Sequence, residues 1–236
     1  MFSAVVQAAK HHRLPVVVHT GTPQDVKDAL DNNVDGIEHG SMRDLIPDAV
    51  VKEMASKGIR YDPTLVVLDS IIRIAHHDMS IVEDPMVRQT VPTKPLAKMN
   101  NWMRNHELDP ALLQIPELRN TAAVKNLVNA YRAGVPLVLG TDSGNLGTFH
   151  GSAVHREMEL WQEAGIPPAD ILKAATSNAA GLLAADGRIG KIAKGYEASL
   201  VIVDGNPLED IRATRRISDV FFKGERVKRS SLFEGN

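Results

Sequence analysis

Residues 15–40 read PVVVHTGTPQDVKDALDNNVDGIEHG, a stretch that predicts a strand, a helix and a second strand. Residues 16–18 are three valines, a run too short for a helix and typical of a strand buried on both faces. Residues 36–40 form the second predicted strand, and the two strands end on His19 and His39. Parallel strands joined by a right-handed crossover end at the same edge of a sheet. We therefore expect the two imidazoles to lie side by side.

Start and stop signals support this βα reading. Thr22 can cap the helix between the two strands, because Pro23 suits the first helical position and Asp25 complements the exposed N–H groups there. A further helix is predicted to end at Gly58, and residues 59–67 are then predicted to form a strand. The sequence therefore favours an α/β fold built from repeated βα units.

A third group suited to metal chemistry lies far downstream. Residues 136–142 read PLVLGTD, an apolar strand that ends in the carboxylate of Asp142. Together with His19 and His39, this carboxylate forms a set that can hold a divalent, zinc-like ion and leave a position open for water.

Four motifs together resemble the metal-dependent amidohydrolase superfamily, in its imidazolonepropionase-like and prolidase-like branch. They are VVH at 17–19, IEHG at 37–40, LGTDSG at 139–144 and GRIGKIAKGYEASLVIVD at 187–204. The resemblance implies a (β/α)₈ TIM-barrel enzyme, with His19 at the end of barrel strand 5, His39 at strand 6 and Asp142 at strand 8.

The resemblance also implies a reaction and roles for these residues. The expected reaction is hydrolysis of a C–N bond in a small amide, dipeptide or cyclic amide by metal-activated water. His19, His39 and Asp142 would bind one or two divalent ions, zinc first among them, and Asp142 would act as general base and then general acid. Tyr61 and His150 are secondary candidates for contacts to the substrate or an oxyanion.

The chain departs from the family pattern in two features. It contains no His-x-His pair, which the family carries on barrel strand 1, and no equivalent of the strand-4 lysine that bridges two metals in many members. We therefore expect the C-terminal portion of a longer enzyme. Residues 1–186 would form the second half of the barrel, about four βα units, and residues 187–236 the C-terminal segment of a composite β-sandwich. The segment 68–114 reads as a helical insertion above the barrel mouth.

Two alternatives remain open at this stage. The first is an N-terminally truncated, inactive fragment that associates with itself or with a missing half, because a half barrel leaves open strand edges. The second is a different reaction of the same superfamily, namely lactone or ester hydrolysis, imidazolone hydrolysis or deamination. The expected partners are a small-molecule substrate and either further copies of this chain or a missing N-terminal half.

Composition excludes several other classes of function. The formal net charge is −2 with charges of both signs interspersed, so no basic stripe for nucleic acid is present. No apolar run reaches the roughly 18 residues of a membrane span. The chain has no cysteine, which rules out disulfides and thiolate catalysis. A cytoplasmic protein is the default expectation.

Overall fold

A computed structural model describes residues 1–106 and 117–232, and these fall into two units. The first unit comprises Met1–Thr64, Arg119–Gly140 and Trp161–Glu197, and the second comprises Leu65–Leu118, Thr141–Leu160 and Ala198–Asn236. Residues 107–114 of the predicted insertion lie outside the described residues. The predicted domain boundary at residue 187 stays a prediction. Among the described residues, no helix has the length and apolar character needed to cross a bilayer.

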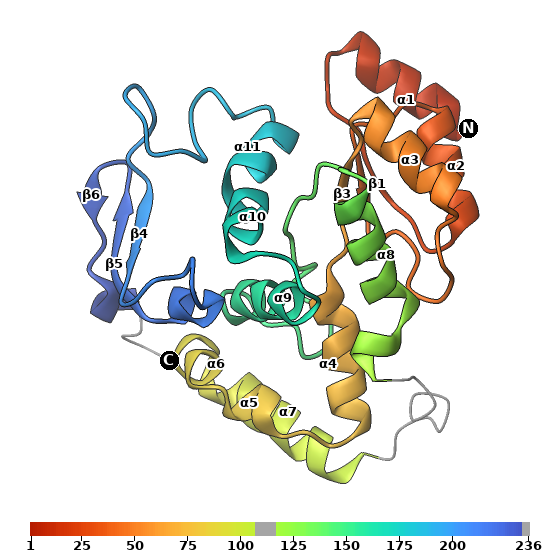
Figure 1. Cartoon of the computed structure of the whole chain (residues 1–236). Helices are drawn as coiled ribbons and strands as arrows, with labels where there is room; N and C mark the ends of the chain where they lie inside the picture. Colours follow the sequence, from red (N-terminus) through yellow and green to blue (C-terminus); the bar gives the residue numbers. More distant parts are fainter. Residues whose placement is uncertain (107–116, 233–236) are drawn as a thin grey trace. The chain divides into compact units, whose positions relative to one another are not determined.

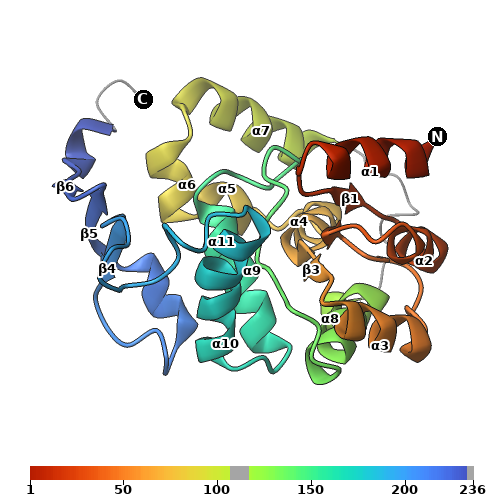
Figure 2. The ribbon, with the colours of Figure 1, turned by 90° about the horizontal axis from the view of Figure 1, so that it is seen from above.

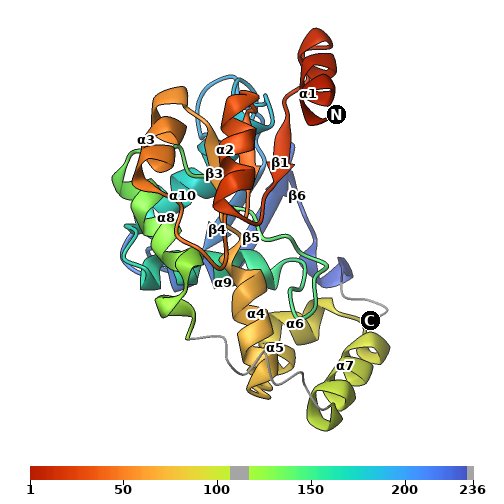
Figure 3. The same cartoon turned by 90° about the vertical axis from the view of Figure 1, so that its right-hand side faces the viewer.

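The first unit is built on parallel strands that alternate with helices. Its elements in chain order are α1 (Phe2–His11), β1 (Val17–His19), α2 (Pro23–Asp31), β2 (Gly36–Glu38), α3 (Asp48–Lys57), β3 (Arg60–Asp62), α8 (Ala122–Arg132), α10 (Pro168–Lys173), the π-helical turn η3 (Ala174–Asn178) and α11 (Ala179–Leu182). Between β3 and α8, the 3-10 turn η2 (Leu118–Asn120) spans the boundary of the two units. Helices α2, α3 and α8 form a row beside the strands (Figures 1 and 3).

The strands pair in the order β1-β2-β3, all parallel. Residues 136–138 continue this sheet: Tyr61 N–H donates to Pro136 O at 3.1 Å, and Val138 N–H donates to Tyr61 O at 2.9 Å. The predicted α/β class is therefore confirmed, whereas the half barrel stays a prediction.

Local signals determine where the helices of this unit begin and end. Thr22 caps α2 as predicted, with Pro23 in the first turn, and the side chains of Thr22 and Asp25 together form a capping box. Gly58 ends α3 in the left-handed conformation, at φ 65°. The predicted burial of residues 16–18 on both faces is wrong, because β1 is an edge strand of the described sheet and Val17 is 40% exposed.

The second unit contains a group of helices and a small antiparallel sheet. Its elements are α4 (Leu65–Ala75), α5 (Ser80–Glu83), α6 (Pro85–Thr90), α7 (Thr93–Asn105), α9 (Ser152–Glu163, whose last residues belong to the first unit), β4 (Leu200–Val203), the 3-10 turn η4 (Ile211–Arg215), β5 (Ile217–Phe222), β6 (Glu225–Arg226) and the 3-10 turn η5 (Arg229–Leu232). Helices α5, α6 and α7 lie beside one another (Figures 1 and 2).

The antiparallel sheet has the order β4-β5-β6. Lys223 and Gly224 connect β5 to β6, both with positive φ, as a two-residue hairpin turn requires. Membership of this sheet in a composite β-sandwich stays a prediction.

The strand predicted over residues 59–67 is wrong in its second half. The strand ends at Asp62, and helix α4 begins at Leu65. The cause is a distant carboxylate: Glu157, fully buried, accepts the N–H groups of Leu65 at 3.0 Å and Val66 at 2.6 Å. A carboxylate at this position satisfies orphan donors and complements the helix dipole, so an apolar β-branched run forms a helix.

A buried amide fixes the loop that follows β2. Asn126 of α8 is fully buried, and its Oδ1 accepts Ile46 N–H at 2.9 Å. Its Nδ2 donates to Ser41 O at 2.9 Å and to Asp44 O at 3.0 Å. One side chain therefore supplies the hydrogen bonds that this loop lacks internally.

Asn126→Leu is expected to lower the free energy of unfolding by about 2 kcal/mol or more, because buried backbone groups lose their partners. Urea unfolding measures the change. Asn129→Leu on the same helix is the matched control, since Asn129 is only half-buried and its side chain makes no hydrogen bond to the described residues. Equal losses in the two variants would contradict the role given to Asn126.

Candidate metal-binding and catalytic site

Two imidazole rings meet at the carboxyl ends of β1 and β2. The register pairs His19 with Glu38, and His39 follows directly. The ring centroids of His19 and His39 lie 4.7 Å apart with an interplanar angle of 65°. The predicted adjacency of the two rings is confirmed. Their role as metal ligands stays a prediction.

His39 is held from three sides. Its N–H donates to Asp62 O at 2.7 Å, and its carbonyl accepts the Tyr61 hydroxyl at 3.2 Å. Its Nδ1 lies 2.6 Å from Thr64 Oγ1. The side chain is buried, and the backbone adopts φ 65°, which is uncommon for a residue other than glycine. Strain of this kind persists only where neighbours impose it.

Thr20 ties the segment after β1 to the segment after β2. Its N–H donates to Glu38 O at 3.2 Å, and its buried hydroxyl lies 3.0 Å from Glu38 O and 2.9 Å from Gly40 O. These two carbonyls flank His39. Because Thr20 directly follows His19, this single residue fixes the separation of the two histidine backbones.

Tyr61, predicted as a contact to the substrate, is fully buried beneath the site. A Cβ at position 40 would lie 2.7 Å from its hydroxyl oxygen, and Gly40 has a φ of +71°. Glycine suits this position because it has no side chain and adopts positive φ readily. The hydroxyl supports the His39 backbone. Contact with a substrate stays a prediction.

The two remaining predicted residues belong to the second unit. Asp142 is exposed, with φ 48°, and its carbonyl accepts Asn145 Nδ2 at 2.9 Å. His150 is an exposed loop residue. Among the described residues, no group of three or more His, Asp or Glu side chains is arranged to hold one metal ion. The grouping of Asp142 with the two histidines stays a prediction.

The histidine pair fits part of a divalent metal site. When Nδ1 of His39 donates to Thr64, the other ring nitrogen, Nε2, carries the lone pair that a metal requires. Two imidazoles are fewer than the three protein ligands of a catalytic zinc. The pair therefore needs at least one further ligand.

Sequence reasoning missed two residues of this arrangement, Thr20 and Asp62. Thr20 directly follows a predicted strand, which is where α/β proteins place functional side chains, and that position was its available signal. Asp62 lay inside the strand predicted over residues 59–67, so no sequence signal marked it as the end of a strand. The contacts themselves depend on neighbouring strands.

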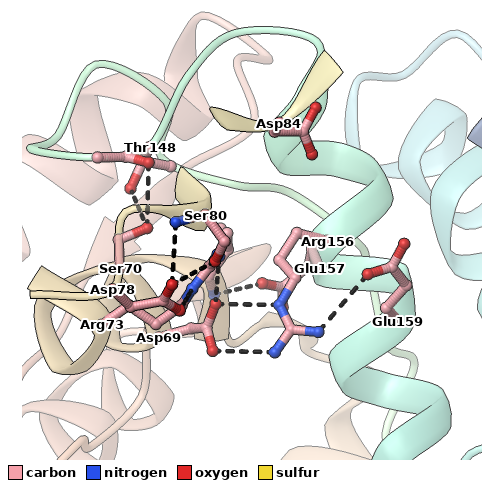
Figure 4. Close-up of polar contacts among 12 residues, drawn as sticks. Asp69, Ser70, Arg73, Asp78, Ser80, Asp84, Thr148, Arg156, Glu157 and Glu159 are labelled. Atoms are coloured by element: carbon pink, nitrogen blue, oxygen red, sulfur yellow. Dashed lines mark hydrogen bonds and ion pairs between the residues drawn. The ribbon is translucent and has the colours of Figure 1, made fainter. Parts of the chain in front are cut away.

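A separate charged cluster lies in the second unit. Arg156 forms a bidentate ion pair with the buried Asp69, both bonds at 3.0 Å, and also contacts Glu159 (Figure 4). Arg73 contacts Asp69 and Asp78. These guanidinium groups satisfy the buried carboxylate, as a stable buried charge requires.

A cavity of about 1030 Å³ borders this cluster. Its wall includes Arg156, Arg215, Asp84 and the buried His155. Neither Asp142 nor His150, the predicted site residues of this unit, lines it. In this wall, Arg156 is paired with Asp69, and Arg215 contacts Asp84 and Glu159.

His155 is held in its neutral form in this wall. Thr214 Oγ1 donates its single proton to Ile211 O at 2.7 Å. His155 Nδ1 lies 3.0 Å from the same hydroxyl oxygen, so the histidine must be the donor in that hydrogen bond. Burial, and secondarily the Arg215 guanidinium, lower the pKa of His155 to about 4. A protonated ring is therefore strongly disfavoured in the folded chain.

Comparison with known proteins defines the class. The two histidines lie at the carboxyl ends of parallel strands, which is where barrel-type α/β folds carry their active sites. The family model described as "Amidohydrolase family" matches residues 1–227. The chain belongs to the amidohydrolase family.

The chain is also similar to particular proteins. Ochratoxinase of Aspergillus niger is 27% identical over 210 residues, which cover 88% of this chain and 36% of that protein. A Xaa-Pro dipeptidase with bound methionine is 26% identical, with a TM-score of 0.69, over 95% of this chain and 47% of that one. A prolidase complexed with N-methylphosphonate-L-proline is 28% identical, with a TM-score of 0.69, over 96% and 48%. The chain thus spans about half the length of these structures or less.

His155 predicts a specific dependence of stability on pH. Its folded pKa of about 4 lies below the ordinary value of 6.5, so only the unfolded chain gains a proton between these limits. The free energy of unfolding should be highest above pH 6.5 and should fall as the pH drops toward 4, by up to about 3 kcal/mol from this group.

His155→Asn, which keeps a donor to Thr214, should remove that part of the pH dependence in urea unfolding at pH 7.5, 6 and 4.5. His150→Asn serves as the control, because His150 is exposed in the same unit. A wild-type slope retained by His155→Asn would contradict the assignment.

Proposed function

We propose that this chain carries metal-binding and catalytic groups of a hydrolase that cleaves C–N bonds in an amide, dipeptide or cyclic amide. The observation that carries the proposal is the pair of imidazole rings, 4.7 Å apart at neighbouring strand ends, in a chain of the amidohydrolase family. Because the chain spans about half of its relatives, the activity of the whole protein is part of the proposal.

In this proposal His19 and His39 bind a divalent ion, zinc first, and Asp142 supplies the third protein ligand. Three ligands and a water are the usual set for a catalytic zinc. Thr64 orients the His39 ring through Nδ1, and such partners are important for metal affinity. The left-handed backbone at His39 and at Asp142 marks both as positions under structural constraint.

Held by these residues, a divalent ion would supply polarisation of the scissile carbonyl and activation of the attacking water. The carboxylate of Asp142 then takes the proton of the attacking water. The same oxygen returns this proton to the leaving nitrogen, so that the amine departs uncharged. Tyr61 and His150 are proposed as secondary contacts to the substrate.

Xaa-Pro dipeptides are the first substrates to examine, because two of the similar structures are a Xaa-Pro dipeptidase and a prolidase. The proposal also includes association of the chain with itself or with a complementary barrel segment. The edge position of β1 and the 40% exposure of Val17 support it.

Zinc stoichiometry tests the metal site. The purified chain, loaded with Zn²⁺ and desalted, should lose its bound zinc in the double variant His19→Ala, His39→Ala, as measured by elemental analysis. The matched control is His11→Ala, His12→Ala, since those rings are also paired, 5.2 Å apart, but lie at the end of α1 rather than at a strand end. Equal zinc in both double variants would refute the site.

Hydrolysis of a Xaa-Pro dipeptide by the zinc-loaded chain tests the catalytic role. Asp142→Asn should lower the rate of amine release about 10²- to 10⁴-fold, because the proton acceptor is lost. His150→Asn should have a much smaller effect. A rate unchanged by Asp142→Asn would exclude Asp142 as the general base.

A further inference from the structure

Asp62 connects the ends of three neighbouring strand segments. Its backbone carbonyl accepts His39 N–H at 2.7 Å, and its carboxylate Oδ1 accepts Gly140 N–H at 2.9 Å. Asp62 is 7% exposed and ends β3, which pairs with β2 in register, Glu38 opposite Asp62. One residue therefore bonds to His39 on one side and to the segment that leads to Asp142 on the other.

The fit between Asp62 and Gly140 is close. A Cβ at position 140 would lie 1.9 Å from Asp62 Oδ2 and 2.9 Å from its Cγ. No side chain can occupy position 140 while the carboxylate stays where it is. The absence of a side chain at Gly140 is therefore matched to the carboxylate of Asp62.

Asp35 makes the equivalent contacts at the opposite end of the same sheet. Its carboxylate Oδ2 accepts Val16 N–H at 2.7 Å, and its carbonyl accepts Arg60 N–H at 3.2 Å. Each aspartate thus bonds to one neighbour through its side chain and to another through its backbone. Hydrogen bonds from N–H groups to a carboxylate are stronger than those between neutral groups, so each aspartate stabilises the sheet.

We propose that Asp62 is a positioning residue of the hydrolytic site. It fixes the strand end that carries His39 relative to Gly140, in the segment that leads to Asp142. This inference rests on the proposed function. The two aspartates differ in the residues to which they are hydrogen-bonded. Asp62 bonds directly to the backbone of His39, whereas Asp35 lies at the amino end of the strands. Only Asp62 should therefore affect the histidine pair.

The test compares Asp62→Ala with Asp35→Ala in the full chain. Both should lower the midpoint of urea unfolding. Only Asp62→Ala should weaken Zn²⁺ binding in calorimetry, by about 10- to 100-fold, as is typical when a residue that orients metal ligands is lost. It should also change the visible absorption spectrum of the Co²⁺-loaded chain, which reports ligand geometry. Equal zinc affinity in the two variants would overturn the inference.

Asp62→Asn separates positioning from folding. Its amide oxygen can still accept Gly140 N–H, so zinc affinity should return to within about threefold of wild type. It also supplies the measurement if Asp62→Ala fails to fold. An Asn variant as weak in zinc binding as the Ala variant would show that the hydrogen bond is not the cause.

A readout without metal distinguishes this inference from the proposed function. In the apo chain, the nuclear Overhauser contact between the His19 and His39 rings should be present in wild type and Asp35→Ala and lost in Asp62→Ala. Absence of zinc binding in wild type would refute the proposed function alone. Retention of the ring contact in Asp62→Ala would refute the positioning role alone.

Discussion

The parallel hydrogen-bond ladder of β1, β2 and β3 is the constraint on which the candidate site depends. Its register pairs His19 with Glu38, and paired residues of a sheet present their side chains on the same face. A fully extended chain would send the next side chain, His39, to the opposite face. The left-handed backbone at His39 ends that alternation, and the two rings meet. The site therefore needs both the regular ladder and one local departure from it.

Features governed by nearby residues could be predicted from the sequence. The capping box of Thr22 and Asp25 involves residues three apart, and the left-handed stop at Gly58 needs only the glycine. The adjacency of His19 and His39 could also be predicted, because a single βα repeat separates them and crossover connections have one hand.

Features governed by distant residues could not be predicted. The apolar run that begins at Leu65 has the composition of a strand, and it forms a helix because Glu157, 92 residues later, accepts its first N–H groups. The role of Asp62 depends on Gly140, 78 residues away. Positive φ at His39 has only a weak signal in its residue type, because histidine adopts it more often than most residues but still in a small minority of cases. In each case the deciding partner comes from another element, which local patterns do not show.

The central claim is that two imidazoles at adjacent strand ends serve together as ligands of one ion. Zinc K-edge X-ray absorption on the zinc-loaded chain tests this most directly, because imidazole rings give distinctive outer-shell scattering. The account predicts two imidazole nitrogens at about 2.0–2.1 Å from the ion, and their loss when His19 and His39 are both replaced. A zinc shell made only of oxygen ligands, with no imidazole scattering, would contradict it.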